Sequence, residues 1–101
     1  MSVALYGATV TLSWNANTES DMASYKIYQT NTPGAWGTPL ATVSIPATSF
    51  DILNVPDGLI YWCISAVDVA GNESAKSDPV NLNINTIAPA KPSGLKAAVK
   101  N

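Results

Sequence analysis

The sequence lacks histidine and arginine, and it contains a single cysteine, Cys63, among its 101 residues. One cysteine cannot form a disulfide within the chain. Without histidine, neither histidine-containing zinc sites nor Ser-His and Cys-His catalytic pairs can be assembled. No stretch approaches the roughly 18 consecutive apolar residues of a membrane-spanning helix, and the N-terminus does not show the basic-then-apolar pattern of a signal peptide. Because histidine is missing and only one cysteine is present, we expect no cofactor, no metal and no enzymatic activity.

Charged residues are also few, and they are unevenly distributed. Seven acidic residues stand against five lysines, which gives a formal net charge of −2. All seven acids lie in residues 1–78, where only Lys26 and Lys76 are basic; the other lysines are Lys91, Lys96 and Lys100. A phosphate backbone requires clustered Lys or Arg, and a membrane-binding patch requires about four to eight basic residues together. The charge pattern therefore predicts no nucleic-acid partner and no membrane partner.

Alternation of apolar and polar residues is the main pattern that is present, and it indicates strands. In residues 8–14, Val10, Leu12 and Trp14 alternate with threonine and serine. Further expected strands are residues 24–30, 39–43, 49–55, 59–68 and 78–85. Gly, Pro, Asn and Asp lie between these runs, and no segment has a sustained helical period. The pattern predicts an all-β sandwich of two packed sheets, with the indoles of Trp14 and Trp62 in its core.

The expected strand at residues 59–68 is nearly all apolar, so two registers have to be weighed. One register points Ile60 and Trp62 into the core, and the other points Tyr61 and Cys63 inward. The first buries more apolar area, at about 25 cal/mol per Å², and leaves the hydroxyl groups of the strand in water. We therefore expect Tyr61 and Cys63 on the outer face. No base or positive neighbour is evident there to activate the thiol.

Three stretches resemble the fibronectin type III domain of bacterial proteins. Residues 10–15 (VTLSWN) are similar to its second strand, and residues 21–28 (DMASYKIY) to the loop and third strand that follow. Residues 64–74 (ISAVDVAGNES) are similar to its sixth strand and the following turn. The resemblance implies an immunoglobulin-like β-sandwich of about seven antiparallel strands. The family usually has a tyrosine just after the Pro-Asp-Gly turn, where this chain has Ile60 followed by Tyr61. Either packing holds this corner, or the alignment is shifted by one residue.

The end of the chain resembles the beginning of a further module. Residues 88–99 are similar to the linker and first strand of another domain of the same family. We therefore divide the chain into a fibronectin type III-like sandwich at residues 1–86 and a tail at residues 87–101. Pro89 and Pro92 make the tail a stiff spacer.

The first strand of the sandwich has two candidate sources. Residues 1–6 offer a short apolar alternation through Val3 and Leu5. Alternatively, the tail folds back or adds to a neighbouring molecule, because an unpaired sheet edge has unused hydrogen-bond partners. The tail residues expected to pair in that case are Leu95, Lys96, Ala97, Ala98 and Val99. If they do not pair, we expect the tail to be disordered in solution.

Three aromatic residues are candidates for partner contact. Trp36 lies in a turn at residues 33–37, where its indole either stacks on a sugar or protein partner or folds over the sheet edge as a cap. Tyr28 and Tyr61 are expected to point outward on neighbouring strands and would extend an aromatic platform with Trp36.

Loop carboxylates are the other candidates: Glu19, Asp21, Asp68 and Glu73. Calcium requires six to eight oxygen ligands, and the sequence has no DxDxDG-like spacing. A pair of glycosidase carboxylates requires a cleft, which short sandwich loops do not provide. We therefore expect Asp21 and Asp68 to accept backbone hydrogen bonds in turns.

These observations predict a non-catalytic module of a larger extracellular or cell-surface protein, acting as a spacer or protein-interaction unit. The alternative is a carbohydrate-binding accessory module that uses its exposed aromatics. The expected partner is accordingly a protein or a polysaccharide, with possible self-association through the C-terminal strand.

Overall fold

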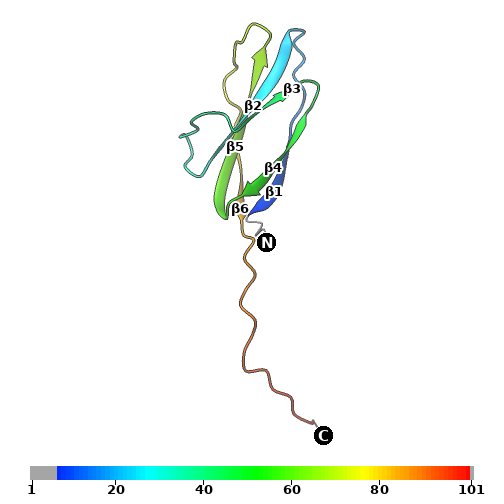
Figure 1. Ribbon diagram of the computed structural model, residues 1–101, viewed down its shortest axis with the longest axis vertical. Coiled ribbons are helices and arrows are strands. Elements are labelled where there is room, and N and C mark those ends of the chain that lie inside the picture. The colour runs from blue at the N-terminus through cyan, green and yellow to red at the C-terminus, as the bar shows by residue number, and fades with distance from the viewer. Residues whose placement is uncertain (1–6, 101) are drawn as a thin grey trace, which may run out of the picture.

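The computed structural model describes residues 7–100, and these residues form two antiparallel sheets packed face to face (Figure 1). The six strands of this region are β1 (Ala8–Ser13), β2 (Met22–Thr30), β3 (Ala41–Ser44), β4 (Ser49–Val55), β5 (Gly58–Asp68) and β6 (Val80–Ile84). One sheet contains β1 and β4, and the other has the order β3-β2-β5-β6. The predicted β-sandwich is therefore confirmed. Residues 1–6, one of the two candidate sources of a first strand, lie outside the described residues.

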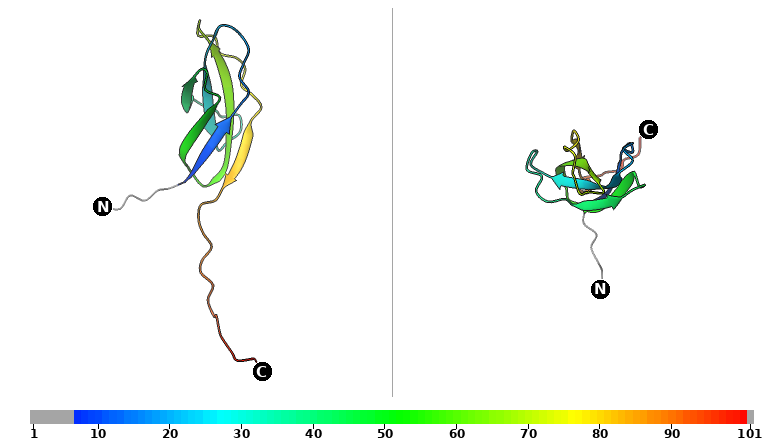
Figure 2. Two further views of the ribbon diagram at one scale, coloured as in Figure 1. Left: turned by 90° about the vertical axis from the view of Figure 1, so that its right-hand side faces the viewer. Right: turned by 90° about the horizontal axis from the view of Figure 1, so that it is seen from above.

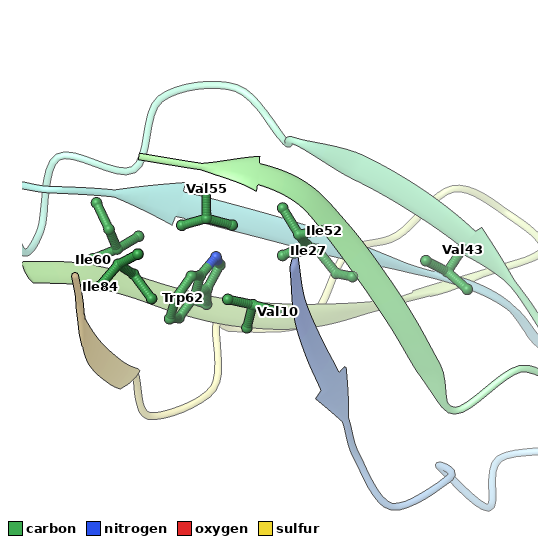
Figure 3. Close-up of a cluster of buried hydrophobic side chains, with 8 residues drawn as sticks. All are labelled: Val10, Ile27, Val43, Ile52, Val55, Ile60, Trp62 and Ile84. Atoms are coloured by element: carbon green, nitrogen blue, oxygen red, sulfur yellow. The ribbon is translucent and has the colours of Figure 1, made fainter. Parts of the chain in front are cut away.

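The core lies between the sheets, where alternate strand residues meet (Figure 3). Trp62 is 1% exposed, and its indole N–H donates a 2.8 Å hydrogen bond to Oε1 of Gln29 on the neighbouring strand. The buried cluster around it consists of Val10, Ile27, Val43, Ile52, Val55, Ile60 and Ile84. Trp14 is only partly buried at the rim of this cluster, with its ring 5.3 Å from that of Tyr25. Trp62 is thus a core residue as predicted, whereas Trp14 is only partly buried and packs against the core cluster.

The predicted register of β5 is confirmed, but its outer face is less exposed than expected. Ile60 and Trp62 point into the core, while Cys63 and Ser65 on the opposite face are also buried. β6 pairs only with the first half of β5, from Gly58 to Trp62. Beyond it, residues 73–77 run along β5 and bring polar side chains over the outer face. The expectation that the hydroxyls of this strand stay in water was therefore wrong for Ser65.

At Gly7, which has φ of +91°, the backbone passes close to the backbone of Asn54 and Val55. A β-carbon at this position would collide with the backbone carbonyl of Val55. Residues 54 and 55 belong to an irregularity in the β1–β4 pairing, where Asn54 also has a positive φ of 58°. Only glycine combines this backbone angle with the absence of a side chain, so Gly7 allows β1 to enter the sheet beside Val55.

The tail continues beyond β6 as an extended segment that leaves the sandwich (Figures 1 and 2). Every residue from 85 to 100 is exposed, and the molecule is 77 Å long in its longest dimension. Its radius of gyration is 20.3 Å, against about 13 Å for a compact chain of this length. Just before the tail, Thr86 is held against the sandwich. Asp57 accepts hydrogen bonds from the backbone N–H and the hydroxyl of Thr86 at 3.0 and 2.8 Å.

Candidate functional site

The expected aromatic platform is not available at Tyr28. This side chain lies on the outer face of the larger sheet, as the alternation predicted, but it is only 4% exposed. Its hydroxyl donates a hydrogen bond to Glu73, and the Lys76 ammonium lies 4.5 Å from the centre of its ring. Tyr28 is therefore covered by residues 73–77, a segment that the strand pattern alone does not place over it.

Glu73 is the centre of this outer-face cluster, which also contains Lys26, Tyr28, Ser65 and Lys76. One carboxylate oxygen accepts hydrogen bonds from the hydroxyls of Ser65, at 2.6 Å, and Tyr28. The other lies 3.7 Å from the Lys26 ammonium. The hydrogen bond from Ser65, followed by that from Tyr28, lowers the pKa of the Glu73 carboxyl, and the hydrogen bond to Glu73 raises the pKa of Tyr28. A carboxylate held ionised by these donors fastens residues 73–77 to the sheet and is a poor general acid.

The Cys63 thiol is also buried, and Cys63 pairs with Tyr28 in the sheet. Burial is the main reason why the pKa of Cys63 is raised. A buried, protonated thiol is a poor nucleophile, because the reactive species is the thiolate.

The two remaining aromatic candidates lie on different elements. Tyr61 is partly exposed on β5, opposite Thr30 of β2. Trp36 is partly exposed in the loop between β2 and β3, just after a turn in which the Ala35 N–H donates to the Thr32 carbonyl at 3.0 Å. Both keep part of their surface accessible, so they remain candidates for partner contact after Tyr28 is removed from the platform.

An open groove lies on the opposite side of the core, between β1 and β6. The larger sheet is wider than the two-stranded sheet that covers it, and β6 projects beyond the cover (Figure 2). Val80 and Leu82 share the inward face of β6 with buried Ile84, yet they remain 57% and 50% exposed. The groove has a volume of about 210 Å³, and its apolar lining includes Leu12, Trp14, Trp62, Ile64 and Val80.

The groove was not predicted from the sequence. The alternation in residues 78–85 correctly indicates which face of β6 points inward, but not whether a strand covers it. That depends on the width of the facing sheet. Within residues 7–100, β1 pairs only with β4, so the other edge of β1 beside the groove has no strand partner. Trp14 is one of the residues that line the groove, and its indole N–H is buried without an acceptor among these residues.

Among the loop carboxylates, Asp68 is the one whose side chain holds a turn. Asp68 accepts hydrogen bonds from the backbone N–H groups of Ala70 and Asn72 at 3.0 and 2.8 Å, and from the Asn72 side chain at 3.0 Å. The side-chain bond from Asn72 is the main cause of the lowered pKa of Asp68. In the part of the chain that the structure describes, no three His, Cys, Asp or Glu residues are grouped so as to hold a metal ion. The turn role expected for Asp68 is confirmed.

Comparisons with known proteins show that this chain is similar to parts of two longer enzymes. The chain is 40% identical over 88 residues to an amylopullulanase from Thermoanaerobacterium saccharolyticum, a match that covers 84% of this chain but 6% of the amylopullulanase. Its fold is similar to part of the spore cortex lytic enzyme SleM of Clostridium perfringens, with a TM-score of 0.62 and 24% identity over 79% of this chain and 25% of that enzyme. No protein-family model matches the chain. This chain therefore spans only a small part of the length of either protein.

Residues 7–100 contain no helix with the length and apolar character needed to cross a membrane.

Proposed function

We propose that this chain is a non-catalytic accessory module, of fibronectin type III character, that separates or positions the functional parts of a larger hydrolytic protein outside the cell. The observation that carries the proposal is the 40% identity to a segment that makes up only 6% of an amylopullulanase. Such a short segment is the size of one small domain within a large enzyme. The sandwich in SleM, at 25% of its chain, supports the same architecture.

The site geometry supports a non-catalytic role. Glu73 and Asp68, the two carboxylates whose pKa values are lowered, are each engaged by hydrogen-bond donors. Glycoside hydrolysis requires a carboxylic acid with a raised pKa opposite a second carboxylate, across a substrate cleft. The open groove is lined mainly by apolar side chains, and it lacks such a pair in its described lining.

A spacer must also hold its neighbours apart, and the tail has the required shape. It leaves the end of the sandwich where Asp57 fixes Thr86, and Pro89 and Pro92 restrict its backbone. Proline-rich segments extend by about 3.1 Å per residue and act as semi-rigid spacers.

Small-angle X-ray scattering of the dilute full-length chain tests the spacer role. We expect a largest dimension close to the 77 Å of the structure. Substituting Pro89 and Pro92 by glycine should shorten the average dimension, because glycine removes the backbone restriction. A compact scattering profile for the natural chain, indistinguishable from that of the double variant, contradicts the proposal.

The second candidate function is carbohydrate binding, favoured by the partial exposure of Trp36 and Tyr61. Titration with pullulan and amylose should quench tryptophan fluorescence if Trp36 stacks on a sugar, since aromatic side chains offer a flat apolar surface for such contacts. Trp36→Ala should then abolish the response, whereas Leu53→Ala on an exposed part of β4 should retain it. No response to either polysaccharide rules out this function for these ligands.

A further inference from the structure

We propose that residues 95–99 of one molecule add as a strand to the β1 edge of a second molecule, the edge that no strand within residues 7–100 pairs with. The added strand would cover the open groove and so link copies of this chain head to tail. The proposal is independent of the spacer role, because it concerns contact between separate copies. It depends on three features of the structure: the β1 edge and its groove, which would accept a strand; the exposed end of the tail, which would supply one; and the direction in which the two strands must run.

The acceptor is the β1 edge together with the groove beside it. No strand within residues 7–100 pairs with this edge. The edge of a sheet presents a row of backbone N–H and C=O groups with which another strand can pair. The same edge borders half-exposed apolar side chains, Val80 and Leu82, that already point toward the core. A third strand in the smaller sheet would lie over β6 and remove these two side chains from water.

The donor is the last part of the tail. Leu95 and Val99 are 95% and 90% exposed, the largest values among the exposed large hydrophobic side chains of residues 7–100. In an extended strand, Leu95, Ala97 and Val99 share one face, and Lys96 and Ala98 take the other. Five residues span about 17 Å at 3.3 Å each, which matches the six residues of β1. The donor thus has the length and the one apolar face that the groove requires.

Charge favours contact between the tail of one copy and the sandwich of another. The seven acids and two lysines of residues 1–78 carry a formal charge of −5, whereas the three tail lysines carry +3. With Leu95, Ala97 and Val99 facing the groove, Lys96 is directed to the outer face of the smaller sheet. That face carries Asp51, next to Thr11 of β1.

The direction of the strands determines how the copies are arranged. The register places Ala8, at the start of β1, opposite Val55, and places Ile84, at the end of β6, opposite Gly58. β1 therefore starts at the end of the sandwich from which the tail leaves. A donor strand antiparallel to β1 must enter from the other end and run toward this one. A second copy stacked in the same orientation presents its extended tail in that direction.

Such an interface is heterologous, since donor and acceptor are different surfaces, and it leaves a free donor and a free acceptor at the two ends. The copies should therefore form open chains rather than closed dimers. The paired area is small, so we expect weak association, with a dissociation constant of about 10 µM to 1 mM.

Sedimentation velocity of the full-length chain, from about 10 µM to about 2 mM, tests the proposal against this affinity range. We expect an average mass that rises with concentration beyond that of a dimer. Ala97→Pro removes a backbone N–H from the tail strand and should leave a monomer at every concentration. Ala97→Val keeps this N–H and favours a strand, so it should associate at least as strongly as the natural chain. Both changes lie on an exposed residue of the tail, so they should not affect folding of the sandwich.

The acceptor is tested separately by Val80→Lys, which places a charge on the groove wall. Its matched control is Leu53→Lys, at a residue that is 67% exposed on β4. Val80→Lys should be monomeric, and Leu53→Lys should associate normally. Mixing Ala97→Pro, which keeps its acceptor, with Val80→Lys, which keeps its donor, should restore dimers that grow no further.

Three results overturn the proposal. A natural chain that stays monomeric throughout shows that the edge is occupied within one molecule or does not pair. Association of Ala97→Pro equal to that of the natural chain shows that another surface is used. A natural chain that stops at dimers shows reciprocal exchange of tails and excludes head-to-tail chains.

Discussion

At the scale of single residues, Glu73 explains the largest difference between expectation and structure. The strand pattern correctly directs Tyr28 to the outer face of the sheet, since side chains alternate along a strand. It does not indicate that Glu73, 45 positions later in the chain, accepts a hydrogen bond from the Tyr28 hydroxyl. The face to which a side chain points follows from the strand itself, whereas its burial also depends on segments far away in the sequence. The sequence could therefore predict the face of Tyr28 but not its burial.

Replacing Glu73 by glutamine tests whether this cluster stabilises the sandwich. The change keeps the size of the side chain but removes the charge that strengthens the hydrogen bonds from Ser65 and Tyr28. Hydrogen bonds to charged groups contribute about 1.5–3 kcal/mol each, and glutamine retains part of this, so we expect a loss of about 1–2 kcal/mol in the free energy of unfolding. Urea denaturation near neutral pH measures it. Unchanged stability contradicts a fastening role, and Glu19→Gln, on an exposed loop, is the matched control.

The lowered pKa of Glu73 also predicts a pH dependence. A carboxyl whose pKa is lower in the folded chain contributes stability that is fully present above its unfolded pKa of about 4.3. This contribution is lost as the pH falls through the lower, folded pKa. The stability difference between the natural chain and Glu73→Gln should therefore be full at about pH 6 and shrink below about pH 4. Asp68 has a lowered pKa as well and adds to the acid sensitivity of both proteins. A difference that stays constant down to about pH 2 contradicts this assignment.

Substitutions at Gly7 and Gly37 distinguish the cost of an unfavourable backbone angle from the cost of a steric clash. Both have a positive φ, of 91° and 62°, but only at Gly7 does an added β-carbon meet backbone, while Gly37 faces open space. Gly37→Ala should cost about 1 kcal/mol, from the unfavourable backbone angle alone. Gly7→Ala should cost about 2–4 kcal/mol, because the Val55 carbonyl must also move. Thermal unfolding of the two variants gives the comparison, and equal losses would show that β1 adjusts freely at its start.

At the scale of elements, the strands themselves were largely predictable. Expected runs at residues 49–55 and 24–30 correspond to β4 and to most of β2, and the bulk of Ile60 and Trp62 was enough to select the register of β5. The expected edge strand at residues 39–43 is shifted by one or two positions, as β3 occupies Ala41–Ser44. The open groove was not predictable, because no single strand records the width of the sheet that faces it.

The tail is the element whose contribution to stability is easiest to isolate. Residues 88–100 are exposed, and they lie beyond the contact between Thr86 and Asp57. Deleting residues 88–101 should therefore leave the melting temperature of a dilute sample, at about 5 µM, unchanged to within about 1 °C. At about 1 mM the deletion should remove self-association, together with any stabilisation that association provides by mass action. A clear drop in melting temperature in the dilute sample would show that the tail folds back on its own sandwich.

At the scale of the whole molecule, the chain is asymmetric in both shape and charge. Within residues 7–100, the acidic sandwich has a β1 edge without a strand partner on one side, and the basic, extended tail leaves from one end. A molecule with separate donor and acceptor surfaces can link to further copies without closing on itself. In a larger protein, the same polarity would let the tail of one unit complete the sheet of the next.

Salt should reveal how far charge contributes to this linkage. Attraction between the +3 tail of one copy and the −5 sandwich of another is screened as ionic strength rises, since the Debye length falls from about 20 Å near 20 mM salt to about 4 Å near 500 mM. We expect association to weaken about three- to tenfold over this range of sodium chloride, a change of about 0.7–1.4 kcal/mol. The variant Lys96→Gln should start weaker at low salt and show a smaller dependence, whereas Lys26→Gln, on the sandwich, should not reduce association. Association that strengthens steadily with sodium chloride would show that apolar burial in the groove dominates and that the charge asymmetry has no part in linking the copies.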